Sequence, residues 1–234
     1  ERALTIYVDK REIVTLMTLG RAPEALAIGY LRNQRLVERL EDIVSVQADW
    51  EVGAVAITTR HGLDDLDGRM QKRTVTTGCG QGTVFGALMD DIEKIRLRDD
   101  VTLSEATFYQ LIDNIRRHDS VYKSAGAVHG CALAQGADIL MFIEDVGRHN
   151  AVDKLIGAAA IRGALPYSGR LLFLSGRCSF ELVQKAGAAG IGAIASVGAP
   201  SDLAVETAER LGICLIGFLR GDAANVYTRS DVVV

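Results

Sequence analysis

The stretch RLLFLSGRCSFELVQKAGAAGIGAIASVG, residues 170–198, decides the fold. It holds two short apolar runs, 170–175 and 192–198, on either side of a helix-like stretch at 180–190. Short, continuously apolar runs that alternate with helices are typical of buried strands in a largely parallel sheet. A second helical pattern at 201–212 and a third apolar run at 213–219 continue the alternation. The segment therefore predicts an α/β fold whose sheet is covered on both faces.

Working outward from this segment, the remaining patterns predict two domains. Between residues 103 and 163 we expect a helix at 103–118 with Ser104 as its N-cap, strands at 124–134 and 137–145, and a helix at 146–163. Residues 1–60 predict two strands around a turn at 9–11, a helix at 22–37 and a hairpin at 42–59. We predict a small α+β domain over residues 1–100 and a larger α/β domain over residues 101–234.

The composition excludes several classes of protein. A formal net charge of −4 argues against a general nucleic-acid binder, which would carry a basic excess. No run approaches the ~18 apolar residues of a membrane span, and the first residues show no signal-type apolar stretch. The cysteines are widely spaced, which fits a reducing compartment better than a disulfide framework. We therefore expect a cytoplasmic protein that binds neither nucleic acid nor membrane.

One cysteine lies in an unusual context. Cys79 is flanked by glycines in TTGCGQG, residues 76–82, within a polar, glycine-rich segment at 61–100 that we expect to be a mobile surface loop. A structural cysteine usually packs as a small apolar residue, and this one has polar or glycine neighbours. The context suits a reactive thiol, although an incidental cysteine is an equal alternative because reactivity depends on exposure and thiolate character.

Three predicted strand ends run into polar or glycine-containing turns, which the carboxyl edge of a parallel sheet would bring together. Two of these turns also open helices, whose free N–H groups attract phosphate. Arg177 of the first turn and Arg220 of the third could bind an anion. Ordinary capping turns are the alternative. The turns are Ser175-Gly176-Arg177, residues 198–201 ending in Ser201, and Arg220-Gly221-Asp222.

A second polar cluster, EDVGRHNAVDK, occupies residues 144–154. His149 and Asp153 are spaced so that both can lie on one face of the helix predicted there. Such polarity on a helix that otherwise carries apolar residues favours a lined pocket, with an exposed first turn as the alternative.

The order of elements from residue 103 resembles the cytidine-deaminase fold. The zinc signature of that family requires H-x-E at one helix start and P-C-x-x-C at the next. Here Ala151 stands where the glutamate would follow His149, and Cys178 has no second cysteine beside it. A catalytic zinc needs three protein ligands, so we predict no zinc.

Four segments together resemble the formate dehydrogenase accessory sulfurtransferase family, FdhD. They are TTGCGQG (76–82), AGAVHGCAL (125–133), EDVGRHNAVDKLIG (144–157) and the region that begins SGRCSFELVQKAGAAGI (175–191). The resemblance covers nearly the whole chain.

This resemblance implies a carrier that takes persulfide sulfur from a cysteine desulfurase and passes it to the molybdenum cofactor of formate dehydrogenase. The cofactor is bis(molybdopterin guanine dinucleotide), so a guanine nucleotide such as GDP or GMP should bind as a mimic. Cys79 matches the first position of the family's C-G-x-C motif, whereas Gly82 replaces its second cysteine. The family's cofactor-binding stretch matches Phe218, Leu219, Arg220, Gly221, Asp222 and Ala223.

Two further expectations accompany the resemblance. Many proteins of this fold pair symmetrically, so a homodimer is expected. Gly82 leaves the loop without a second cysteine to relay sulfur, so sulfur could pass from Cys79 directly to the acceptor or through Cys178. The alternative function is a chaperone that binds the cofactor without transferring sulfur.

Overall fold

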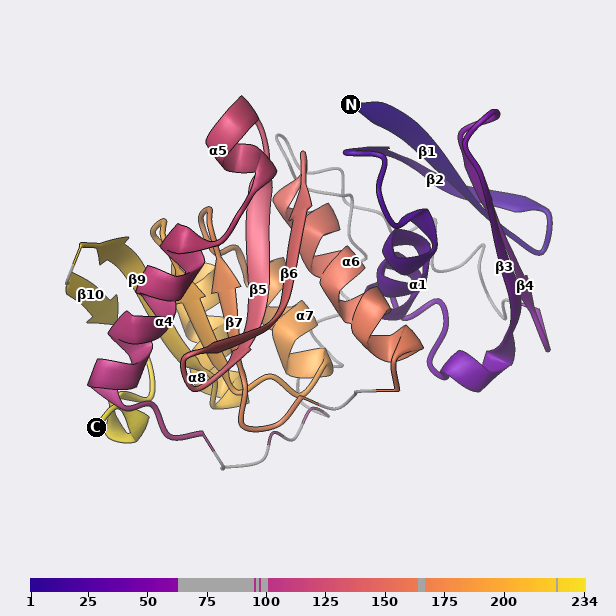
Figure 1. Ribbon diagram of the computed structural model, residues 1–234. Coiled ribbons are helices and arrows are strands. Elements are labelled where there is room, and N and C mark those ends of the chain that lie inside the picture. The colour runs from indigo at the N-terminus through magenta and orange to yellow at the C-terminus, as the bar shows by residue number, and fades with distance from the viewer. Residues whose placement is uncertain (63–94, 96, 98–100, 164–166, 222) are drawn as a thin grey trace. The chain divides into compact units, whose positions relative to one another are not determined.

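The computed structural model describes residues 1–62, 95, 97, 101–163, 167–221 and 223–234 of the chain. Its elements are drawn in Figure 1, and its backbone contacts group into two compact units. The first unit comprises Glu1–Met89 and Asp145–Gly163, and the second comprises Asp90–Glu144 and Ala164–Val234. This grouping differs from the predicted division near residue 100, because residues 145–163 belong with the N-terminal part of the chain.

The first unit contains a four-stranded mixed sheet in the order β2-β1-β4-β3. Strands β1 and β4 are parallel, and the other two pairs are antiparallel. The predicted turn between the first two strands is confirmed: Asp9 and Lys10 have φ of 47° and 69°, as a two-residue hairpin turn requires. The elements are β1 (Arg2–Val8), β2 (Arg11–Thr18), α1 (Pro23–Asn33), η1 (Leu40–Asp42), β3 (Ile43–Asp49), β4 (Ala54–Thr59) and α6 (Arg148–Ile161).

Helices α1 and α6 pack against each other at two glycines. A Cβ atom on Gly29 would overlap the backbone carbonyl of Asp153, and one on Gly157 would overlap that of Ala25. The two backbones therefore approach more closely than any larger side chain would allow. This contact explains why α6 groups with the N-terminal part of the chain.

The second unit contains a six-stranded mixed sheet in the order β10-β9-β8-β7-β5-β6. The three apolar runs at 170–175, 192–198 and 213–219 become β7, β8 and β9, which are parallel neighbours, while β5 runs antiparallel to β7. The elements are α4 (Glu105–Arg117), α5 (Val121–Ala125), β5 (His129–Gln135), β6 (Asp138–Asp145), β7 (Leu171–Leu174), α7 (Phe180–Ala188), β8 (Ala193–Ser196), α8 (Asp202–Leu211), β9 (Cys214–Arg220), β10 (Ala223–Val226) and η2 (Ser230–Val232).

The central strands β7 and β8 of this sheet are buried on both faces, as predicted. Leu171 and Phe173 of β7 pack in one apolar cluster with Phe108 and Leu111 of α4. Alternate residues of a strand point to opposite faces, so the equally buried Leu172 and Leu174 face the other side, where α7 and α8 lie (Figure 1). The chain thus has a mixed α/β fold with two mixed sheets.

One local prediction is corrected. The strand expected at 124–134 begins only at His129, because Val121–Ala125 forms the short helix α5. The carboxylate of Glu144 accepts hydrogen bonds from the N–H groups of Val121 and Tyr122 at 2.7 and 3.1 Å, which caps α5 from a distant part of the sequence. Ser104 is the N-cap of α4, as predicted, although its side chain makes no cap hydrogen bond.

Candidate functional site

Three turns of the second unit lie along one edge of its sheet, because they follow the neighbouring parallel strands β7, β8 and β9. Backbone hydrogen bonds link them in series. The N–H of Gly198 donates to the carbonyl of Gly176 at 3.1 Å, and the N–H of Phe218 donates to the carbonyl of Gly198 at 3.3 Å. The turns that the sequence predicted at this edge therefore lie side by side.

Glycine is required where these turns meet. A Cβ atom on Gly198 would lie 2.8 Å from the Cα of Arg177, and one on Gly217 would lie 2.9 Å from the Cδ of Pro200. The turns can therefore approach each other this closely only because Gly198 and Gly217 carry no side chain.

Two helices begin at this edge. Ser179 is the N-cap of α7, and Ser201 is the N-cap of α8, where its hydroxyl oxygen accepts from the N–H of Ala204 at 3.2 Å. The N-terminal N–H groups of a helix carry a partial positive charge. The exposed side chain of Arg177 adds a full charge beside the start of α7. Together these groups favour an anionic ligand.

The serines at the edge have structural partners. The Oγ of Ser175 accepts from the N–H of Gly130 at 2.9 Å, which ties the end of β7 to β5. Sequence reasoning missed Ser196, whose buried hydroxyl contacts the carbonyls of Gly176 and Gly198 at 2.9 and 2.8 Å. A lone hydroxyl at the end of the apolar run of β8 was the signal that could have found it.

The third turn presents an arginine and an aromatic ring. Nη1 of Arg220 donates to the carbonyls of Val197 and Leu219, both at 2.9 Å, and its guanidinium carbon lies 5.2 Å from the centre of the Phe218 ring. Phe218 has φ of +58°, a left-handed conformation that costs a non-glycine residue about 1–2 kcal/mol. The end of β9 therefore places an aromatic ring next to a cation at the sheet edge.

The other residues of the predicted cofactor-binding stretch differ in their surroundings. The side chain of Leu219 lies in the apolar core and is 6% exposed, so it could contact a ligand only through its backbone. Ala223 begins β10 opposite Arg220, and Nη2 of Arg116 donates to the carbonyl of Gly221 at 3.0 Å. Asp222 lies outside the described residues.

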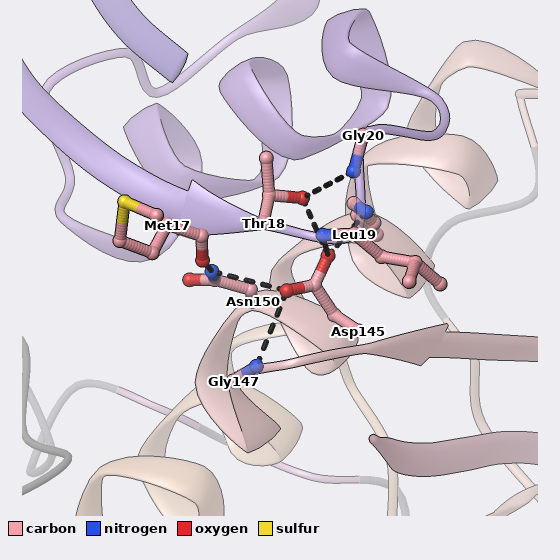
Figure 2. A network of polar contacts seen from close by, with 8 residues as sticks. Met17, Thr18, Leu19, Gly20, Asp145, Gly147 and Asn150 are labelled. Atoms are coloured by element: carbon pink, nitrogen blue, oxygen red, sulfur yellow. Dashed lines mark hydrogen bonds and ion pairs between the residues drawn. The ribbon is translucent and has the colours of Figure 1, made fainter. Parts of the chain in front are cut away.

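The polar cluster at the start of α6 forms part of the first unit, and most of its groups bond within that unit (Figure 2). The buried carboxylate of Asp145 accepts from the hydroxyl of Thr18 at 2.6 Å and from the N–H groups of Leu19 and Gly147, each at 3.2 Å. It also pairs with the buried ammonium of Lys154. These bonds join the end of β2 to the start of α6.

Two further members of the cluster also make structural contacts. Nδ2 of Asn150 donates to the carbonyl of Met17 at 2.8 Å, and the carboxylate of Asp153 accepts from Nδ2 of Asn33 at 2.5 Å. His149 is 4% exposed. These residues are buried, so they do not form the exposed first turn considered as an alternative in the sequence analysis. The polar groups of Asp145 and Asn150 bond to other parts of the first unit and do not line an open pocket.

The cysteines in the described part of the chain are buried. Cys131, Cys178 and Cys214 are each 1% exposed. Burial raises the pKa of Cys214 to about 11, because a thiolate loses its hydration there. Cys79 lies outside the described residues, so its predicted role in catalysis stays a prediction.

No group of three or more His, Cys, Asp or Glu side chains in the described part of the chain is placed to hold a metal ion. Among the same residues, no helix has the length and apolar character needed to cross a membrane.

Comparison with known proteins gives a consistent result. The model of the FdhD/NarQ family matches residues 1–234. A sulfur carrier protein FdhD from Shouchella clausii is 33% identical over 232 residues, which cover 97% of this chain and 86% of that protein. The corresponding protein of Mycobacterium tuberculosis is 36% identical over 250 residues, covering 99% and 89%.

A solved structure shares the fold. A protein from Desulfotalea psychrophila, described as a formate dehydrogenase accessory protein, superimposes with a TM-score of 0.78. The alignment covers 99% of this chain and 88% of that one at 23% sequence identity. The chain therefore shares its mixed α/β fold with an experimentally determined structure.

Proposed function

The chain belongs to the FdhD/NarQ family, and from this premise we propose that it is a sulfur carrier for the maturation of formate dehydrogenase. In this proposal Cys79 receives sulfur as a persulfide from a cysteine desulfurase and delivers it to the molybdenum cofactor, bis(molybdopterin guanine dinucleotide). The acceptor is bound as cargo before its insertion into the dehydrogenase.

The observation that carries this proposal is the burial of Cys131, Cys178 and Cys214. A carrier thiol must meet two different partners, so it needs access and thiolate character. The three buried cysteines lack access, and Cys79 stands among glycines and polar residues in the sequence. Burial of Cys178 also disfavours a relay through that residue and supports direct transfer from Cys79.

The first chemical step follows from thiol exchange chemistry. The thiolate of Cys79 attacks the outer sulfur of the desulfurase persulfide, a new S–S bond forms, and the desulfurase cysteine leaves as a thiolate. In the second step the outer sulfur passes to the metal of the cargo, which supplies the two electrons that convert it to sulfide. The Cys79 thiolate leaves and is ready for another cycle.

The sheet edge supports the binding half of the proposal. The starts of α7 and α8, together with Arg177 and Arg220, suit the phosphate groups of a guanine dinucleotide. We expect GDP or GMP to bind there as a mimic of one end of the cofactor. The same proposal places the protein in the cytoplasm and as a homodimer. It also includes a cytidine-deaminase-like fold for the second unit.

Intact mass measurement tests the sulfur step. The chain is incubated with a cysteine desulfurase and cysteine, and we expect a mass gain of one sulfur atom in the unchanged protein and in Cys178→Ser, but none in Cys79→Ser. Cys79→Ser should also fail to support formation of active dehydrogenase. A sulfur adduct that persists in Cys79→Ser and disappears in Cys178→Ser would show that Cys178 is the carrier.

A second candidate function follows from Gly82, which replaces the second cysteine of the family motif. The protein would then bind and deliver the cofactor as a chaperone without sulfur chemistry. Full maturation of the dehydrogenase by both cysteine variants would favour this function.

A further inference from the structure

Strand β3 forms one edge of the four-stranded sheet in the first unit. It pairs with β4 on one side, and no second strand in the described part of the chain pairs with it on the other. In an antiparallel pair, alternate residues direct both their N–H and C=O groups away from the partner strand. The free edge of β3 therefore presents a row of backbone donors and acceptors, which is a template for another strand.

This free edge has little protection against strand addition. Proteins usually protect such an edge with lysine, proline, a bulge or a very short strand. β3 has seven residues, IVSVQAD, and contains neither lysine nor proline. Its bulge lies at the beginning, around Val44, and the pairing with β4 is regular from Ser45 to Asp49. Residues 45–49 are thus open to a partner strand.

The apolar core beneath β3 is incompletely covered. Val55 and Ile57 of the neighbouring β4 are 0% and 2% exposed, whereas Val46 and Ala48 of β3, which pack against the same cluster, are only partly buried. Every second side chain of a strand points to the same face of its sheet. Apolar residues at alternate positions of an added strand would therefore lie beside Val46 and Ala48 and complete the cover of the cluster.

Two carboxylates at the end of β3 have no ion pair. Asp49 and Glu51 are exposed, and neither forms an ion pair with a described residue. The carboxylate of Asp49 accepts a hydrogen bond from the N–H of Glu51 at 2.8 Å, which fixes it in the turn. The guanidinium of Arg2 lies over the ring of Trp50 at 5.7 Å. A cation on a partner segment would thus meet two negative charges that have no ion-pair partner of their own.

A second copy of the chain does not supply such a cation. Antiparallel pairing of two β3 strands about a two-fold axis would bring the beginning of one strand to the end of the other. The beginning holds Glu41 and Asp42 together with Arg39 and Arg60, so its charges cancel. The carboxylates at the end of β3 therefore favour a different protein, whose segment carries a surplus of cations.

We propose that the free edge of β3 binds an extended segment of a partner protein by strand addition. The segment alternates apolar with polar residues and carries lysine or arginine at the end that meets Asp49 and Glu51. In recognition of this kind, main-chain hydrogen bonds give affinity, and alternate side chains give specificity. The surface belongs to the first unit and involves neither Cys79 nor the cofactor, so it is independent of the proposed function.

A fluorescence titration tests this site, because Trp50 directly follows β3 and is the only tryptophan of the chain. The probe is a synthetic peptide with acetylated and amidated ends, in which valine alternates with threonine and lysines flank both ends. We expect a saturable change in Trp50 emission. Hydrogen exchange should show added protection in β3 and none in β10, an edge strand of the other sheet.

Two further peptides separate strand addition from simple charge attraction. A peptide with the same lysines and a centre made of proline keeps the charge but has no backbone N–H groups to donate, so it should not bind. A peptide with glutamates in place of the lysines keeps the backbone groups, and like charges should weaken its binding.

Glu51→Lys tests the carboxylates from the side of the protein. It exchanges one attraction for a repulsion, so the affinity for the lysine peptide should fall about 2- to 30-fold. The matched control is Glu209→Lys, which makes the same change of charge at an exposed site on α8 and should leave the affinity unchanged. Equal melting temperatures would show that both variants are folded.

Each part of the proposal has an outcome that overturns it. Failure of the lysine peptide to bind would refute the site, and equally tight binding of the proline peptide would refute strand addition. Equal affinities of Glu51→Lys and the unchanged protein would refute the role of the carboxylates. A dimer of the protein that the lysine peptide dissociates would assign the edge to a second copy instead.

Discussion

Lysine side chains are rarely buried completely, yet that of Lys154 in α6 is only 1% exposed. Its ammonium pairs with the fully buried carboxylate of Asp145, which also accepts hydrogen bonds from Thr18 and from two backbone N–H groups. A buried ion pair of this kind adds little net stability, whereas removal of one partner leaves an uncompensated charge.

Lys154→Met tests this pair. Methionine fills a similar volume but leaves the Asp145 charge without a cation, so the free energy of unfolding should fall by about 3–5 kcal/mol in urea titrations. The control is Arg210→Met, which breaks the exposed Arg210–Glu206 pair and should change stability by no more than about 0.5 kcal/mol. Equal effects of the two substitutions would show that the buried pair is dispensable.

The buried thiol of Cys214 should make stability depend on alkaline pH. Its pKa is raised from an ordinary value of 9.0 to about 11 in the folded protein, mainly by burial. The unfolded chain therefore loses this proton first, and the stabilisation is complete below about pH 9 and decreases as the pH rises toward about 11.

Urea midpoints between pH 8 and pH 10.5 measure this effect. Cys214→Ala should show a shallower loss of stability with pH than the unchanged protein, because the substitution removes the shifted group. Parallel pH profiles for the two proteins would contradict the burial effect.

Alkylation at pH 8 should leave Cys131, Cys178 and Cys214 unmodified until the chain is unfolded, because all three are buried.

At the scale of elements, the contact between α1 and α6 depends on small residues. Alanine in place of glycine normally favours a helix, yet the methyl group of Gly157→Ala would overlap the carbonyl of Ala25. We expect a net loss of about 1–3 kcal/mol by urea denaturation, since the helices must separate to fit the methyl group. Ile161→Ala, at an exposed site on the same helix, should change stability by about 0.5 kcal/mol or less.

Helix capping gives a second test at this scale. Ser201 accepts a hydrogen bond from the N–H of Ala204, whereas Ser104, in the same position before α4, makes no such bond. Ser201→Ala should therefore cost about 1 kcal/mol, and Ser104→Ala should cost clearly less. The two substitutions form a matched pair because both serines are exposed. Equal losses by thermal denaturation would contradict the capping role of the Ser201 hydroxyl.

At the scale of the whole molecule, the two compact units should be visible in hydrogen exchange. Residues that unfold together exchange through the same opening event. We expect the amides of α6 to exchange together with those of α1, rather than with those of β7, β8 and β9, which follow α6 in the chain and belong to the second unit.

Gly157→Ala makes this expectation specific. The substitution should accelerate exchange in both α1 and α6, while protection in β7, β8 and β9 stays the same. Mass spectrometry of peptides from each element measures the rates. Faster exchange across the second unit, with no change in α1, would show that α6 unfolds with the second unit.

Much of the fold could be predicted from local pattern. The apolar runs at 170–175, 192–198 and 213–219 became parallel strands, and the turn at Asp9 and Lys10 became a hairpin. These elements depend on a periodicity of two or 3.6 residues and on turn residues, all of which lie within a few positions of one another. The side-by-side arrangement of three turns at the sheet edge followed from the same reasoning.

Tertiary structure alone decided the features that depend on distant partners. Helix α5 begins where Glu144 caps it from 23 residues away. The buried carboxylate of Asp145 accepts a hydrogen bond from Thr18, 127 residues earlier in the chain, which compensates for its lost hydration. In β9 the apolar sequence allows either Phe218 or Leu219 in the core, and only the pairing with β10 selects Leu219. In each case the deciding energy is a contact between segments that local sequence does not bring together.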